Sequence, residues 1–173
     1  MRLSYLVRGF PGHPLHPPLT DATIGAYTTA AVLGILAFAG VSEGNLTRAW
    51  WLALLVGLGF TAFAALTGLA EWLSITWRSP LWWTATWHML VMVSATVFFG
   101  LAAIFGHDGW KTGDVTTGPF ILTVVGFGLL AVGGWLGGTI VFVHGMRVLG
   151  LVDEPPERAV APVPHPEKEQ AEA

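Results

Sequence analysis

Four long apolar stretches restrict the fold of this chain more than any other feature of its sequence. They cover residues 21–40, 50–75, 81–105 and 119–149. Each has the length, about 20 residues, that an α-helix needs to cross the hydrocarbon core of a bilayer. Only 11% of the 173 residues are charged, whereas soluble domains contain about 25%. The stretches are apolar on all sides and lack the polar stripe of a soluble amphipathic helix. The sequence therefore predicts an all-α membrane protein, a four-helix transmembrane bundle.

Turn signals separate the four predicted helices and define three regions. Ser79 and Pro80 suit the N-cap and the first position of the third helix. Residues 106–118 contain four glycines and read as a solvated loop. We divide the chain into an N-terminal interfacial segment (1–19), the bundle (20–150) and an acidic, proline-rich tail (151–173). The composition of the tail predicts disorder.

Basic and aromatic residues are unevenly shared between the two ends of the predicted bundle. With four spans, both termini lie on one side. That side carries Arg2, Arg8, Arg78, Arg147, Arg158 and Lys168, and the other carries Arg48 and Lys111. The positive-inside rule therefore predicts that both termini are cytoplasmic. Tryptophans near the helix ends predict two aromatic belts, with Trp50, Trp51 and Trp110 in one and Trp72, Trp77, Trp82, Trp83 and Trp87 in the other.

Composition also excludes several classes of function. The net charge of −3 leaves no basic surface for nucleic acid. The absence of cysteine excludes disulfides, thiolate zinc sites and covalently attached c-type haem. Phosphate-binding loops, nucleophile elbows and the H-E-x-x-H motif are missing. The sequence therefore indicates no particular enzymatic reaction, and the bilayer is its first predicted partner.

Most ionisable residues in or beside the predicted spans fall at the same end of the bundle. They are His13, His16, Glu71, His88 and His144. Ionisable groups that face lipid are costly, so we expect these side chains to point inward and form one site. Asp21 is a weaker member, because the helix dipole favours an acid in a first turn anyway. The prolines around His13 and His16 predict that neither lies on a regular helix.

These donors suit two kinds of cofactor, and a third interpretation needs none. In the first, His88 and His144 are the axial ligands of haem b, with Arg78, Arg147 or Arg8 near its propionates. In the second, His13, His16, Glu71, His88 and His144 supply ligands to a transition metal. In the third, the cluster is a structural hydrogen-bond network in a membrane anchor or assembly subunit. Six glycines in the last span favour close helix packing, or alternatively leave room for a flat cofactor.

The stretch GHPLHPPLTD at residues 12–21 resembles the start of a bacterial family of predicted membrane proteins known as domain of unknown function 2231. Three further pieces are similar to that family: the small-residue stretch Thr67–Trp72 that contains Glu71, the early His88, and Gly133-Gly134 followed by His144-Gly145. The resemblance implies a four-span membrane fold without an established activity. Some relatives are linked to Rieske-type iron–sulfur modules, so the resemblance also implies electron transfer with a redox protein partner.

Overall fold

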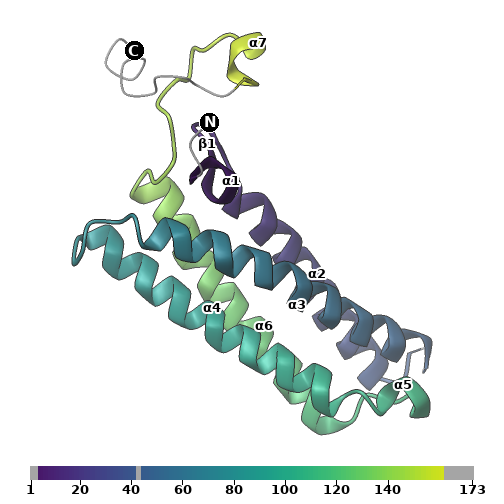
Figure 1. Ribbon diagram of the computed structural model, residues 1–173. Helices are drawn as coiled ribbons and strands as arrows, with labels where there is room; N and C mark the ends of the chain where they lie inside the picture. The colour runs from purple at the N-terminus through teal and green to yellow at the C-terminus, as the bar shows by residue number, and fades with distance from the viewer. Residues whose placement is uncertain (1–3, 42–43, 162–173) are drawn as a thin grey trace.

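Four long helices lie side by side in a computed structural model that describes residues 4–41 and 44–161 (Figure 1). They are α2 (His16–Phe38), α3 (Asn45–Trp72), α4 (Pro80–Phe105) and α6 (Thr117–Gly138), which the π-helix η1 (Thr139–Val143) extends. By length and composition, all four are able to cross a membrane. The prediction of an all-α, four-span bundle is confirmed.

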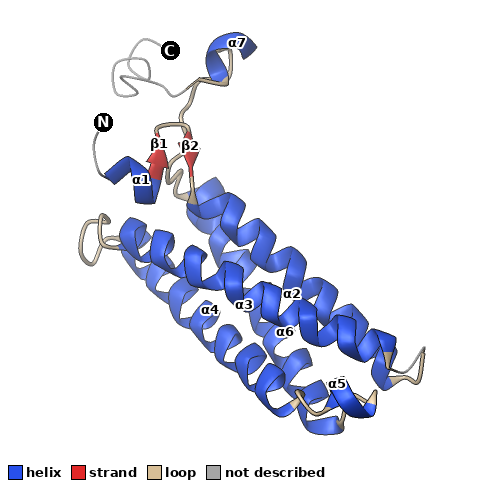
Figure 2. Cartoon of the chain, turned by 45° about the vertical axis from the view of Figure 1, so that its right-hand side comes forward, coloured by secondary structure: helices blue, strands red, loops and turns tan. Residues whose placement is uncertain are grey.

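Short elements decorate the two ends of the bundle. Helix α1 (Ser4–Arg8) leads into an antiparallel pair of strands, β1 (Gly9–Phe10) and β2 (His13–Pro14), which stands where α2 begins (Figure 2). We call this end, where α2 and α4 begin, the site end. Helix α5 (Gly109–Thr112) lies in the loop at the opposite end, and α7 (Pro156–Ala159) belongs to the tail. Residues 162–173 of the predicted disordered tail lie outside the described residues.

The helix boundaries at the site end differ from those expected. Helix α2 begins at His16, five residues before the predicted span, because prolines in a first turn lose no helical hydrogen bond. His16 is therefore on a regular helix, contrary to expectation. The last span ends as a π-helix at Val143, so His144 and Arg147 lie in the segment beyond it. The predicted N-cap is confirmed, since the Ser79 hydroxyl accepts the N–H of Trp82 at 3.1 Å.

The bundle consists of two similar helical hairpins. Helix α2 packs mainly along α3, and α4 packs mainly along α6, with less contact between the two pairs. In the first hairpin the ring of Tyr27 lies against Gly57, and in the second the ring of Phe99 lies against Gly126. Tyr27 and Phe99 stack on each other at 3.9 Å between ring centroids, with 11° between the ring planes. Both are almost fully buried, so α2 and α4 face each other across the centre of the bundle.

Trp50 is part of the core and not of an aromatic belt, so this part of the belt prediction is wrong. Its side chain is fully buried, and its indole N–H donates to the Thr123 hydroxyl at 3.2 Å. The indole occupies the space beside Gly34 and Gly106, where an added Cβ would meet it. Gly34 on α2 and Gly106, which follows α4, thus leave room for this large ring inside the bundle.

Candidate functional site

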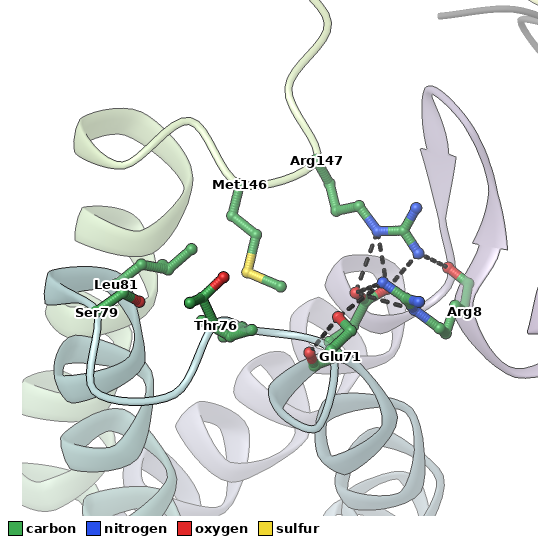
Figure 3. Close-up of a pocket in the computed structure, with 9 residues that line it drawn as sticks. Arg8, Glu71, Thr76, Ser79, Leu81, Met146 and Arg147 are labelled. Atoms are coloured by element: carbon green, nitrogen blue, oxygen red, sulfur yellow. Dashed lines mark hydrogen bonds and ion pairs between the residues drawn. The ribbon is translucent and has the colours of Figure 1, made fainter. Parts of the chain in front are cut away.

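At the site end of the bundle, the buried carboxylate of Glu71 is bonded to two arginines (Figure 3). Glu71, near the end of α3, is 6% exposed. Arg147 Nη2 lies 2.6 Å from Glu71 Oε1, and its Nε lies 3.1 Å from Oε2. Arg8 Nη2 lies 3.1 Å from Oε2. Opposite charges at this distance, with the carboxylate shielded from water, keep Glu71 in a strongly bonded ion-pair network.

The network joins three segments that are far apart in the sequence. Arg147 also donates to the backbone carbonyl of Arg8 at 3.3 Å, and Arg8 donates to the Ser74 hydroxyl at 2.8 Å. Arg147 adopts a left-handed backbone conformation, with φ of 63°, which is uncommon for a residue other than glycine. The turn after η1 thus directs the Arg147 guanidinium back toward α3.

Sequence analysis identified Glu71 and Arg147 but did not identify Arg8 as part of this network. Arg78, proposed beside haem propionates, is exposed and makes no hydrogen bond or ion pair within residues 4–41 and 44–161. The signal for Arg8 was available in principle. A carboxylate inside a predicted span needs compensating donors, and Arg8 is a cation on the same side of the membrane.

His16, at the first position of α2, is bonded to α3. Its Nδ1 lies 3.0 Å from the carbonyl oxygen of Ala64 and 3.2 Å from the Thr67 hydroxyl. Its ring rests on Gly68, where an added Cβ would come within 2.7 Å of His16 Cε1. A carbonyl only accepts hydrogen bonds, so Nδ1 carries the hydrogen. In the neutral ring, Nε2 therefore holds a free lone pair.

His88, two turns into α4, repeats this arrangement on the second hairpin. Its Nδ1 donates to the carbonyl of Gly133 on α6 at 2.8 Å, and its ring rests on Gly137 at 3.2 Å from an added Cβ. Gly137 follows Gly133 by four residues, just as Gly68 follows Ala64. The same chemical argument places the lone pair of the neutral ring on Nε2.

The two histidines occupy equivalent positions in the two hairpins. His16 precedes Tyr27 by eleven residues, and His88 precedes Phe99 by eleven residues. Tyr27 and Phe99 stack across the centre of the bundle, so the helices that carry both histidines face each other. Neither Nε2 atom makes a hydrogen bond within the described residues.

The other predicted site residues differ from this pair in their contacts and exposure. His144 follows η1, and its Nε2 is bonded to the Thr84 hydroxyl at 3.0 Å. His13 is exposed on β2, and Asp21 is exposed on α2. In the part of the chain that the structure describes, no three His, Asp or Glu side chains converge on a position that could hold a metal ion. The expected five-residue metal site is therefore not assembled.

Comparisons with curated proteins and with solved structures gave no match. A family model described as a predicted membrane protein, domain of unknown function 2231, matches residues 12–150. This match covers all four long helices, the histidine pair and Glu71. The chain therefore belongs to the family of predicted membrane proteins that share domain of unknown function 2231.

Proposed function

We propose that this multi-pass membrane protein binds haem b through His16 and His88, in support of electron transfer at the membrane. The proposal rests on one observation, which is that the two imidazoles make equivalent hydrogen bonds. Each donates Nδ1–H to a backbone carbonyl of the other helix of its own hairpin and leaves Nε2 without a partner among the described residues. A hydrogen bond from Nδ1 to a carbonyl fixes the ring orientation and tautomer that a ligating histidine needs.

The number of donors favours haem over a protein-bound metal ion. Haem iron takes four nitrogens from the porphyrin and needs two axial ligands from the protein. Zinc takes three or four protein ligands, and residues 4–41 and 44–161 provide no cluster of that kind. Helical bundles commonly hold cofactors between side chains of facing helices. We therefore replace the pair predicted from sequence, His88 and His144, with His88 and His16.

The remaining features of the bundle suit the proposed role. Gly68 and Gly137 leave room for the two rings close to the helix backbone, and this close contact limits the movement of each imidazole. The two hairpins contact each other less than the helices within each hairpin do. A flat group such as haem would therefore enter between the α2–α3 hairpin and the α4–α6 hairpin. Haem supplies one-electron redox chemistry when bound. A soluble redox protein, such as a Rieske-type module, would exchange electrons at the site end.

The proposed orientation places the site end toward the cytoplasm of a bacterial inner membrane. Arg8, Arg78 and Arg147 lie at the site end. At the opposite end, Arg48 donates to the carbonyl of Trp110. An excess of arginine is typical of cytoplasmic loops. Both termini would then be cytoplasmic.

A second candidate function is that of a membrane anchor or assembly subunit without a cofactor. The ion-pair network favours it, because Glu71 ties the N-terminal segment and the segment after η1 to α3. Within the described residues, every buried side-chain nitrogen and oxygen has a hydrogen-bond partner. A polar network of this kind fixes how helices pack without any bound group.

Absorbance spectra of the purified protein, oxidised and then reduced with dithionite, distinguish the two candidates. The protein should be expressed with added haem precursor and analysed for metals in the same sample. We expect a Soret band that shifts on reduction and disappears in His16→Ala and in His88→Ala. His107→Ala, which changes a histidine at the opposite end beside Trp51, is the matched control and should keep the band.

Three outcomes would contradict the haem proposal. Protein that folds normally without haem and without metal would favour the anchor function. Stoichiometric metal without a Soret band would show that the site holds an ion completed by ligands from solvent. A band that survives in His16→Ala but is lost in His144→Ala would restore the ligand pair predicted from the sequence.

A further inference from the structure

A pocket of about 470 Å³ opens at the site end, beside the Glu71 network (Figure 3). Arg8 and Arg147 lie on one side of it, and the hydroxyl residues Ser74 and Ser79 also line it. Met146 contributes to an apolar part of the wall. The histidine pair is not among the lining residues, so this pocket is separate from the proposed haem site.

The charge of the pocket is not balanced. Its lining contains two guanidinium groups and one carboxylate, which leaves one net positive charge. The bonds to Glu71 use the Nε and Nη2 atoms of both arginines. The Nη1 group of each makes no hydrogen bond within the described residues. Both side chains remain about 30% exposed, so their free N–H groups are accessible to a ligand.

We propose that this pocket binds the phosphate of an anionic phospholipid. Guanidinium groups bind phosphate oxygens with paired, charge-assisted hydrogen bonds. The Ser79 hydroxyl, which accepts the N–H of Trp82, still has its own hydrogen to donate, and the nearby start of α4 adds the positive end of a helix dipole. The pocket lies beside the end of α3 and the start of α4, and the ends of helices that cross a membrane lie near the lipid headgroups. Basic pockets at this depth are suited to anionic lipids, and the apolar wall near Met146 suits the glycerol and acyl part.

Thermal unfolding in a neutral detergent provides the test. Purified protein is titrated with short-chain phosphatidylglycerol, with phosphatidylcholine of the same chain length, and with inorganic phosphate. We expect phosphatidylglycerol to raise the unfolding temperature in a saturable way that salt weakens. Equal stabilisation by phosphatidylcholine would overturn the charge argument. Equal binding of inorganic phosphate would overturn the assignment to a lipid, because the apolar wall would then contribute nothing.

Glu71→Gln is the most informative variant, because the proposal predicts a gain of binding. It keeps an acceptor for the arginines and raises the net charge of the pocket from one to two. A unit charge about 6 Å away changes anion affinity about threefold at the dielectric constant of water and more in a shielded pocket. We therefore expect at least a threefold tighter dissociation constant for phosphatidylglycerol. A folding defect would not produce tighter binding.

Matched arginine variants locate the site on the protein. Arg8→Gln should weaken phosphatidylglycerol binding at least threefold by the same charge argument. Arg48→Gln makes the same chemical change at the opposite end, where Arg48 donates to the Trp110 carbonyl, and should leave binding unchanged. Weaker binding in Glu71→Gln, or equal losses in the two arginine variants, would overturn the proposal.

Discussion

Gly68→Ala tests whether the helix surface beneath His16 holds the imidazole in place. The added Cβ would lie 2.7 Å from His16 Cε1 and 3.1 Å from Nδ1. Ordinary van der Waals contact begins near 3.4 Å, so the ring would have to move by roughly 0.7 Å. The bond from Nδ1 to the Ala64 carbonyl is already 3.0 Å long. A shift of this size would weaken or break it, at a cost of about 1–3 kcal/mol for a buried polar group.

Gly59→Ala is the matched control, because it makes the same change on the lipid-facing side of α3. An added Cβ at Gly59 meets no atom within 4 Å. Alanine is favoured over glycine in a helix by up to about 1 kcal/mol, and this gain is common to both variants. The difference in unfolding free energy between them therefore isolates the displacement of His16. We expect Gly68→Ala to be the less stable by about 1–3 kcal/mol.

Thermal or denaturant unfolding in detergent, followed by circular dichroism, measures this difference. Nitrogen-15 NMR of labelled histidine reports in parallel whether His16 Nδ1 keeps its hydrogen bond. Equal stability of the two variants, together with an unchanged Nδ1–H signal in Gly68→Ala, would refute the reasoning.

Gly137→Ala makes the equivalent test in the second hairpin. Its added Cβ would lie 3.2 Å from His88 Cε1, so its effect should have the same sign and a smaller size.

Three further perturbations address the network, the core and the orientation. Glu71→Ala leaves two arginines without their shared acceptor and should lower the unfolding free energy by about 1–3 kcal/mol after allowance for their partial exposure. The control is Arg158→Ala, which removes an exposed guanidinium paired with Glu154 in the tail, and it should change the unfolding free energy by less than about 1 kcal/mol. Gly57→Ala places a Cβ against the buried ring of Tyr27 and should lower the unfolding free energy by about 1–3 kcal/mol in the same assay. An unfolding free energy equal to that of Gly59→Ala would contradict the packing of Tyr27 against Gly57. A reporter fused to the C-terminus should read cytoplasmic and one in the loop between α4 and α6 periplasmic, and the opposite pattern would reverse the proposed orientation.

The fold was predictable from sequence because lipid imposes a simple rule on chain composition. A helix is the one way in which an isolated apolar segment satisfies its backbone in a bilayer, so four apolar stretches gave four helices. The helix ends were less predictable, because they depend on local contacts. Prolines compatible with a first turn extended α2 back to His16, and a π-helix ended the last span before His144.

The candidate site was predictable in its depth but not in its pairing. Counting residues along each helix placed His88, Glu71 and the N-terminal histidines at one end. The count did not show which ring nitrogen of each histidine makes a hydrogen bond. His16 and His88 are bonded through Nδ1, whereas His144 is bonded through Nε2, and this difference distinguishes the pair from His144. Nor did the count show Arg8 at Glu71, because that contact depends on how the segment before α2 folds back over the bundle.

The two hairpins suggest how such a chain arises from a shorter one. A pair of spans leaves the membrane on the side where it entered, so a tandem copy of the pair inserts in the same orientation and needs no new topological signal. Residues at equivalent positions then diverge independently. The pair Tyr27 and Thr61 is joined by a hydrogen bond at 3.0 Å, whereas the corresponding Phe99 and Leu130 are both apolar and buried. The two imidazoles, in contrast, are the same residue at equivalent positions of the two hairpins.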